Sequence, residues 1–560
     1  MSNIKNASLS RRSFVSVASA ACGLALASTV GCSSPNNTTD EKPKEDGAKA
    51  AQGDAPQTNE AKNKDSLTIY VGEEPEDGFD PLSSYWGTNG AYALFQSRLL
   101  AFDKDLKIVP DLAEKFEKSE DGLTYTYTLK DGLKFSDGSD VTADDVVFSY
   151  LTIRDNGAGH IDFQLLEDAK ALDPKTIEFK LKQKDSSFVA RTAKLCIVPK
   201  AGYDPQQYRV KPMGSGPFKL VQYEPGQQLI IEPNEYYYGT KSPFKRITLL
   251  FINGETALAH AQAGELDVAM VQPEYAKEHV EGMKLETLPT IDTRGFNLPT
   301  IKPQEIDGKT RGNDVTVDPA IRKALSIGIN RQEIVDHALN GIGTPHSALL
   351  HSVPWANPES EFKDDRLDEA KKILDDAGWV AGSDGIRVKD GLKAEFTITG
   401  RADDIQRHNL AVALSEQAKK LGINIIAKSA AWKECRGNAG AEPTCWGTGD
   451  YDPSADLMGY YHSTGAINES RYSNPKVDDY AKQALEADGD EINKLWQKMQ
   501  WDGTTGPESE NGEHPYIWLA TIDHTYFVNE NLDICAENQP VHPHGHGWPV
   551  ICNINEWKIK

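Results

Sequence analysis

Residues 120–149 read EDGLTYTYTLKDGLKFSDGSDVTADDVVFS, a stretch that contains a strand, a turn and the start of a helix. Leu123 to Leu129 alternate apolar and polar residues between two Asp-Gly pairs, which predicts a half-buried strand. Thr142 precedes a run with an acid three residues later, at Asp145, and this spacing predicts a helix N-terminus that continues through Tyr150. Strand followed by helix is the pattern of a mixed α/β protein.

Strands and helices also alternate through the rest of residues 66–560, and the sequence there contains no tandem repeat. Strands are expected at 67–71, 392–398 and 423–427, and helices at 318–325, 330–339, 368–377 and 405–420. The helix at 405–420 closes at Gly422 directly before a strand, which is the unit expected of a two-lobed binding fold. The predicted class is therefore α/β.

The first 65 residues are expected to contain targeting signals and a tether rather than a part of the folded body. Ser10 to Ser16, with Arg11 and Arg12, resemble a twin-arginine export signal, and residues 29–32 resemble a lipobox that ends at Cys32. Residues 1–31 are thus expected to be removed as a signal peptide and Cys32 to be lipidated. Residues 33–65 contain no large apolar side chain, so a disordered tether is expected.

Composition excludes several functions. The 560 residues carry 60 Lys and Arg against 84 Asp and Glu, a formal charge of −24 that becomes −27 without the signal peptide. This charge argues against a nucleic-acid partner, because phosphates are held by basic surfaces. A mean hydropathy of −0.53 and the lack of long apolar runs argue against a multispanning membrane protein.

The motifs of common enzymes are missing, and no cofactor is expected. The sequence has no P-loop, GxSxG, HExxH or dinucleotide-binding fingerprint. One local cluster stands out, His542-Pro543-His544-Gly545-His546. Its three imidazoles either hold Ni²⁺, Cu²⁺ or Zn²⁺, or are structural residues of a Gly/Pro-rich loop.

Cysteines and aromatic residues give weaker indications. Outside the cytoplasm, cysteines close in sequence invite disulfides, here Cys435 with Cys445 and Cys535 with Cys552, leaving Cys196 buried and free. Aromatic residues among Gly, Ser and Asp are suited to line a ligand cleft or to pack between lobes. They are Tyr85, Trp86, Trp446, Tyr460, Tyr461 and Trp548.

The order of motifs resembles the family 5 extracellular solute-binding proteins, the receptors of dipeptide, oligopeptide and nickel ABC importers. The resemblance covers residues 66–560, and the strongest single match is Thr142–Ser149. The other matching segments are Asp80-Pro81, Ile108–Glu114, Glu120–Tyr125, Lys130–Gly138, Gly214–Phe218, Asn234–Gly239, Ala263–Asp267 and Asp318–Arg331.

This resemblance implies a two-lobed fold of the periplasmic-binding-protein type (type II, or cluster C), with a hinge and an additional domain on lobe I. The implied ranges are 66–107, 214–300 and 527–560 for lobe I, 108–213 for the extra domain and 301–526 for lobe II. It also implies a monomer without enzymatic activity, anchored by its lipid to the outer face of the cell membrane. Its partners would be a permease and an ATPase of an ABC importer.

The resemblance suggests a peptide ligand first. Peptide receptors of the family hold the α-ammonium with an Asp after a Trp and ahead of Asp-Pro, and Asp450 follows Trp446 in that way. Arg294, Phe296 and Asn297 resemble the crossover strand, whose edge could pair with a peptide main chain while Arg294 meets its carboxylate. The alternative is a receptor for a metal or metal chelate that uses His542, His544 and His546.

Overall fold

The computed structural model describes residues 65–560 apart from 76–77, 84–93, 157–160 and 546, all within one compact unit of residues 61–560. The twin-arginine signal, Cys32, the tether up to residue 64, Tyr85, Trp86 and His546 lie outside the described residues. Among the residues that are described, no helix has the length and apolar character needed to cross a bilayer.

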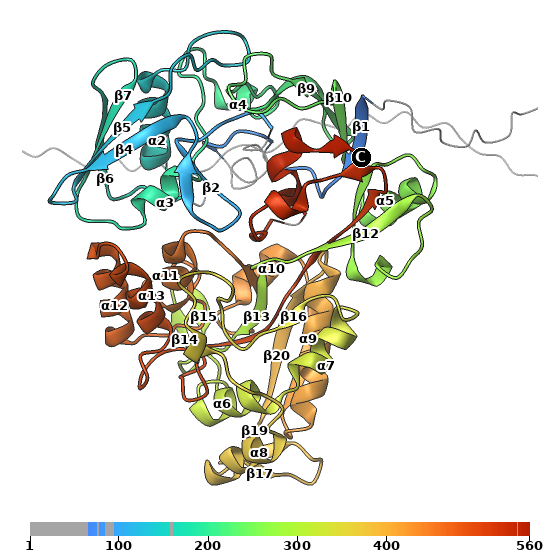
Figure 1. Cartoon of the computed structure of the whole chain (residues 1–560). Coiled ribbons are helices and arrows are strands. Elements are labelled where there is room, and N and C mark those ends of the chain that lie inside the picture. Colours follow the sequence, from blue (N-terminus) through green and yellow to red (C-terminus); the bar gives the residue numbers. More distant parts are fainter. Residues whose placement is uncertain (1–64, 76–77, 84–93, 157–160, 546) are drawn as a thin grey trace, which may run out of the picture. The chain divides into compact units, whose positions relative to one another are not determined.

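Lobe I is built on a mixed seven-stranded sheet, whose strands come from three distant parts of the chain (Figure 1). Its central strand β1 (Ser66–Tyr70) pairs in parallel with β10 (Arg246–Leu250) and β11 (Val268–Val271). The remaining strands, in the order β12-β24-β11-β1-β10-β9-β8, are β12 (Met283–Leu288), β24 (His524–Asn529), β9 (Gln228–Pro233) and β8 (Phe218–Glu224). The shorter elements are α5 (Gly254–Gln262), η1 (Pro273–Tyr275), β25 (Leu532–Asp533), η3 (Ala536–Asn538), η4 (Trp548–Glu556) and β26 (Lys558–Ile559).

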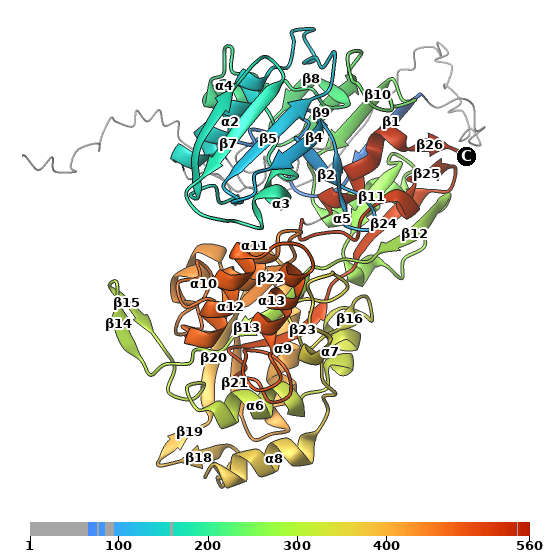
Figure 2. The same cartoon turned by 60° about the vertical axis from the view of Figure 1, so that its left-hand side comes forward.

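The extra domain contains the stretch that opened the sequence analysis. β5 (Thr124–Leu129) buries every second side chain in an antiparallel sheet of order β4-β5-β7-β6. Helix α2 (Ala143–Asn156) packs beside this sheet (Figure 2), and the Asp145 carboxylate accepts hydrogen bonds from the Thr142 N–H and hydroxyl, as the capping pattern predicts. The other elements are β4 (Ala113–Lys118), β6 (Leu166–Ala171), β7 (Thr176–Leu181), α3 (Phe188–Thr192) and α4 (Pro205–Tyr208).

In the described part of the chain lobe II has four sheets, and two of them contribute residues to its buried core. One sheet has the order β16-β23-β13-β22, from β16 (Thr344–Pro345), β23 (Tyr516–Thr521), β13 (Thr293–Asn297) and β22 (Cys445–Thr448). The other is the parallel pair β20 (Glu395–Arg401) and β21 (Asn424–Ala430). The helices are α6 (Pro319–Gly328), α7 (Arg331–Ala338), η2 (Pro358–Ser360), α8 (Leu367–Asp376), α9 (Ile405–Lys419), α10 (Trp432–Asn438), α11 (Pro453–Tyr461), α12 (Pro475–Glu486) and α13 (Glu491–Gln500). The small strands are β14 (Gln304–Ile306), β15 (Lys309–Arg311), β17 (Val380–Ala381), β18 (Arg387–Lys389) and β19 (Leu392–Lys393).

Three boundaries differ from the expected ranges, namely those at residues 107, 300 and 526. The hairpin of β2 (Leu100–Phe102) and β3 (Ile108–Pro110) straddles the boundary expected at residue 107, because its strands pair with each other and Leu100 is buried in the core of the extra domain. β13 was expected in lobe I, but it pairs with β22 and β23 of lobe II. The chain therefore crosses between the lobes at residues 289–292 and returns at 522–523, which leaves β24 in the sheet of lobe I.

Candidate functional site

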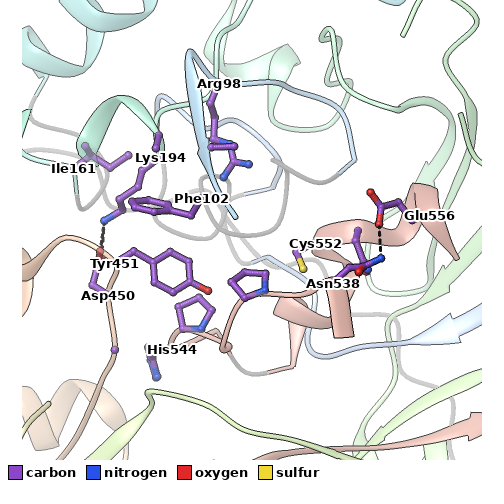
Figure 3. Close-up of a pocket in the computed structure, with 16 residues that line it drawn as sticks. Arg98, Phe102, Ile161, Lys194, Asp450, Tyr451, Asn538, His544, Cys552 and Glu556 are labelled. Atoms are coloured by element: carbon purple, nitrogen blue, oxygen red, sulfur yellow. Dashed lines mark hydrogen bonds and ion pairs between the residues drawn. The ribbon is translucent and has the colours of Figure 1, made fainter. Parts of the chain in front are cut away.

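A cavity of about 380 Å³ lies where the extra domain, lobe II and the C-terminal segment meet (Figure 3). The extra domain supplies Arg98, Phe102 and Lys194, and lobe II supplies Asp450 and Tyr451. The C-terminal segment closes the wall with residues between Asn538 and Glu556, among them Pro540, Pro543, His544, Cys552 and Asn553. The volume is within the range of about 300–1,000 Å³ that is typical of small-ligand sites.

An ion pair crosses this cavity between the extra domain and lobe II. Lys194, two residues beyond α3, places its Nζ 2.8 Å from Oδ1 and 2.6 Å from Oδ2 of Asp450. Asp450 lies in the loop between β22 and α11, and its Oδ1 also accepts the N–H of Asp452 at 2.8 Å. The carboxylate of Asp450 is thus neutralised by a cation of the protein itself.

A second carboxyl group lies behind Asp450. Asp456 accepts the backbone N–H of Asp450 at 2.9 Å and the hydroxyl of Thr448, and is itself buried. Burial, followed by the nearby charge of Asp450, raises the pKa of Asp456 to about 7. This group holds its proton well above the usual range of a carboxyl and fixes the loop that carries Asp450.

Two aromatic rings join the walls of the cavity. The rings of Phe102 and Tyr451 lie 5.1 Å apart between centroids, and they come from the extra domain and lobe II. The hydroxyl of Tyr451 donates to the carbonyl of Val541 at 2.6 Å, which ties lobe II to the C-terminal segment. These rings provide apolar contact area for a ligand beside the charged groups.

The remaining charges of the cavity lie on other walls. In Figure 3 the Arg98 side chain reaches into the cavity from the extra domain, and Glu556 stands on the side of the C-terminal helix. Glu556 is exposed and its Oε2 accepts from Asn538 Nδ2 at 3.5 Å. Burial raises the pKa of the Cys552 thiol to about 12, although the positive charge of Arg98 opposes this shift. Cys552 therefore presents a neutral thiol to the cavity.

A buried ion cluster lies one helical turn before Lys194. The Arg191 guanidinium contacts Asp185 at 2.5 Å within the extra domain, and Asp452 at 3.0 Å and Ser454 Oγ at 2.9 Å in lobe II. The side chains of Arg191, Asp185 and Asp452 are each at most 7% exposed. Asp452 is also the N-cap of α11, so the cluster anchors the helix that follows the Asp450 loop.

Only part of the predicted peptide site lines the cavity. Asp450 does, whereas Arg294, Phe296, Asn297 and Trp446 do not. The proposed pairing of a peptide with β13 is wrong, because β22 and β23 already occupy both edges of this strand.

The side chains of that strand serve the core of lobe II instead. Arg294 is buried and pairs with Asp292 at 2.9 Å, and Phe296 is fully buried in the core. Asn297 donates to the Ala439 carbonyl and accepts from the indole N–H of Trp446. Of the other predicted cleft aromatics, Tyr460 and Tyr461 lie in a core cluster of lobe II, and Trp548 lies in that of lobe I.

The described histidines of the C-terminal cluster have separate partners. His542 contacts His524 through their Nδ1 atoms at 3.1 Å and Gln539 at 2.8 Å, while His544 Nδ1 lies 2.8 Å from Asp292 Oδ2. Burial lowers the pKa of His542 and of His544, so both rings are held neutral. Within the described residues no group of three or more His, Cys, Asp or Glu is placed to hold a metal ion.

The predicted disulfides are not formed, since Cys196, Cys435, Cys445, Cys535 and Cys552 are all free thiols. Cys435 lies on α10 with its sulfur 3.4 Å from the carbonyl of Ala430, whereas Cys445 is fully buried at the start of β22. The Cys535 sulfur lies 3.4 Å from the Glu556 carbonyl, and Cys552 lines the cavity. The two disulfides were predicted from proximity in sequence alone, but the four cysteine side chains face different packing environments.

Sequence reasoning missed Lys194, Arg98, Phe102 and Cys552 as cavity residues. None of them belongs to a recognisable motif. Tyr451 could have been predicted as a cavity residue, because it directly follows Asp450 in the sequence segment that was singled out. The others are brought to the cavity only by the packing of the extra domain and the C-terminal helix against lobe II.

Comparison with known proteins agrees with the motifs. The model of bacterial extracellular solute-binding proteins, family 5 Middle, matches residues 107–468. Protein XP55 of Streptomyces lividans is 32% identical over 488 residues, which cover 84% of this chain and 86% of that protein. Oligopeptide-binding protein AppA of Bacillus subtilis (strain 168) is 27% identical over 519 residues, covering 85% and 89% of the two chains.

Solved structures include proteins with a similar fold. The crystal structure of NikZ from Campylobacter jejuni in complex with Ni(L-His) superposes with a TM-score of 0.75 at 24% identity, over 88% of this chain and 99% of that one. The two-lobed α/β fold expected from the sequence is confirmed. The chain belongs to the bacterial extracellular solute-binding proteins of family 5.

Proposed function

We propose that this protein is the substrate-binding lipoprotein of an ABC importer, which captures peptides between its lobes and delivers them to a membrane permease. The observation that carries the proposal is the cavity of about 380 Å³, whose wall is shared by the extra domain, lobe II and the C-terminal segment. Family membership and the peptide-binding relative AppA support the ligand class. The protein acts by binding, without a cofactor or covalent chemistry.

The ligand is enclosed by a change in the angle between the lobes. Two chain segments, 289–292 and 522–523, connect the sheets of the lobes, and His542 pairs alongside Thr290 next to one of them. Closure is favoured by a ligand that binds the closed arrangement more tightly than the open one. Lys194, Asp450, Phe102 and Tyr451 are the groups through which both walls contact the ligand.

The N-terminal segment is proposed to provide export and anchoring to the membrane. Residues 1–31 direct export through the twin-arginine route, Cys32 receives the lipid, and residues 33–65 serve as a tether. The folded body is then held, as a monomer, at the outer face of the cell membrane beside its permease and ATPase partners.

Isothermal titration of the purified protein with a library of di- to pentapeptides tests the ligand class. We expect micromolar or tighter binding that is lost in Cys552→Trp, because the indole fills the cavity, and kept in the conservative variant Cys552→Ser. An unchanged melting temperature of Cys552→Trp excludes misfolding as the cause. If no peptide binds the unmodified protein, the proposed ligand class is wrong.

The second candidate is a receptor for a metal chelate. It is favoured by His544, which lines the cavity, and by the nickel-binding periplasmic protein of Escherichia coli (strain K12), which is 27% identical over 353 residues. Titration with Ni²⁺ alone and with nickel–histidine separates the two candidates. Nickel binding that is lost on replacing His542, His544 and His546, together with the absence of peptide binding, would establish the second.

A further inference from the structure

The two crossovers between the lobes, residues 289–292 and 522–523, are hydrogen-bonded to each other. Thr290 donates its hydroxyl to the Ile522 carbonyl at 2.5 Å. In return, the N–H of Ile522 donates to the Asp292 carbonyl at 3.1 Å. A change in the angle between the lobes therefore has to be absorbed by both crossovers together.

A third segment, residues 541–544, runs along the first crossover, and we call it the C-terminal strap. The Ile291 N–H donates to the His542 carbonyl at 2.8 Å, and the His542 N–H donates to the Pro289 carbonyl at 3.1 Å. The Nδ1 atoms of His542 and His524 lie 3.1 Å apart, and His524 directly follows the second crossover. The strap thus pairs with one crossover as a strand would and contacts the end of the other.

The strap is also fixed to the lobe II loop that carries Asp450. The N–H of His544 donates to the Gly449 carbonyl at 2.9 Å, and the hydroxyl of Tyr451 donates to the Val541 carbonyl at 2.6 Å. Three of these residues, and Asp450 itself, line the cavity. A ligand in the cavity therefore contacts the same loop that holds both ends of the strap.

The same loop packs directly on the first crossover. Gly449 has no room for a side chain, because a Cβ at this position would lie 2.5 Å from the carbonyl oxygen of Ile291. Beside this contact, His544 Nδ1 lies 2.8 Å from Asp292 Oδ2. The Asp292 carboxylate is paired with Arg294 at 2.9 Å, so it is the acceptor and the His544 Nδ1–H is the donor.

We propose that the C-terminal strap is a third, non-covalent strand of the hinge, and that His544 is the positioning residue that connects the Asp450 loop to both crossovers. His544 acts through Asp292, whose carbonyl receives Ile522 of the second crossover. A ligand that contacts the loop then biases the angle between the lobes through the strap. This inference rests on the proposed function, because the ligand that contacts the loop is the peptide proposed above.

Hydrogen–deuterium exchange of the purified full-length protein tests the connection, with mass spectrometry of fragments that cover the two crossovers. Tyr451→Phe removes the hydroxyl that holds Val541 and keeps the ring in place. We expect the crossover amides to exchange about fivefold faster in this variant, the factor that corresponds to one hydrogen bond. Tyr480→Phe, which removes the hydrogen bond of another lobe II hydroxyl to Asp502, is the matched control and should not change exchange at the crossovers.

A second pair of variants tests the role of His544. His544→Phe removes the donor to Asp292 and keeps an aromatic ring in the cavity wall, so exchange at the second crossover should become about tenfold faster. His544→Asn should restore the exchange rate to within about twofold of the unmodified protein, because its amide N–H can donate to Asp292 in the same way. Exchange in the core strand β20 should stay unchanged in both variants, whereas a general loss of stability would accelerate it.

The library of di- to pentapeptides is the probe for the effect of a ligand. Equilibrium dialysis establishes the peptide concentration at which the cavity is occupied. At that concentration, exchange at the crossovers should become slower by about fivefold in the unmodified protein and by less than about twofold in His544→Phe.

The outcomes distinguish the two proposals. Unchanged exchange at the crossovers in both Tyr451→Phe and His544→Phe would overturn the inference, whether or not peptides bind. Bound peptides that slow exchange as much in His544→Phe as in the unmodified protein would also overturn it and leave the receptor function intact. Faster exchange in Tyr451→Phe without any peptide binding would support the connection through the strap and refute the proposed ligand class.

Discussion

Two of the ion pairs that connect the extra domain to lobe II lie one helical turn apart, and they differ in their exposure to solvent. Lys194–Asp450 faces the cavity, with side chains 17% and 26% exposed. Arg191–Asp452 is at most 7% exposed and shares its guanidinium with Asp185 and Ser454. Burial alone would raise the pKa of Asp452, but the charges of Arg191 and Lys194 outweigh burial and lower it.

This difference in solvent exposure indicates that the two ion pairs have different roles. A buried ion cluster whose members satisfy one another holds two surfaces together, and it is costly to break because an uncompensated charge remains inside. A partly solvated pair contributes less to stability but remains accessible to a ligand. The Arg191 cluster therefore fixes the docking of the two walls, and the Lys194 pair sets the charge that a ligand meets between them.

The largest effect is expected from breaking the buried cluster. Arg191→Met leaves the carboxylates of Asp185 and Asp452 buried without their cation, which should lower the free energy of unfolding by about 3–5 kcal/mol. Urea unfolding measures this loss. The triple variant with Asp185→Asn and Asp452→Asn removes the stranded charges and should recover a large part of it. A loss below about 1 kcal/mol in Arg191→Met would show that the cluster does not hold the walls together.

An intermediate effect is expected from Asp456, and it depends on pH. Its pKa is raised from its usual value near 3.8 to about 7, so the folded protein keeps this proton while the unfolded chain releases it. Its contribution to stability is therefore complete below pH 3.8 and is lost as the pH rises towards 7. Between pH 4.5 and 7.5, the free energy of unfolding of Asp456→Asn should therefore decrease by about 2–4 kcal/mol less than that of the unmodified protein. Parallel pH profiles for the variant and the unmodified protein would contradict the raised pKa.

The smallest effect is expected from a third pair between the same two parts, Lys118 and Asp488, whose side chains are 37% and 59% exposed. Lys118→Ala should lower the free energy of unfolding by only about 0.2–1 kcal/mol, since solvent screens exposed pairs. The same urea experiment measures it. A loss as large as that of Arg191→Met would mean that exposure does not distinguish the pairs.

Much of the local structure was predictable from the sequence. The strand at 123–129 and the Thr142–Asp145 helix start follow from alternation and capping chemistry, which act between residues close in the chain. Asp318 and Asn330 cap α6 and α7 for the same reason. Asp450, which the motif resemblance singled out, lines the cavity, and its role in ligand binding stays a prediction.

The features that were wrong depend on long-range packing. The register of β13 between β22 and β23 joins residues more than a hundred positions apart, so its own five residues do not reveal that both edges are paired. The disulfide predictions failed similarly, since short sequence separation does not determine which way two side chains face.

The sequence by itself determined the family, the α/β class and the start of its helices, because these are encoded by local patterns and ordered motifs. Only the tertiary structure decided what Asp450 contacts. Lys194 is 256 residues away, and nothing in its neighbourhood marks it as the partner of this carboxylate. Their pairing arises from the docking of the extra domain on lobe II, where surfaces formed by distant segments must match in shape and charge.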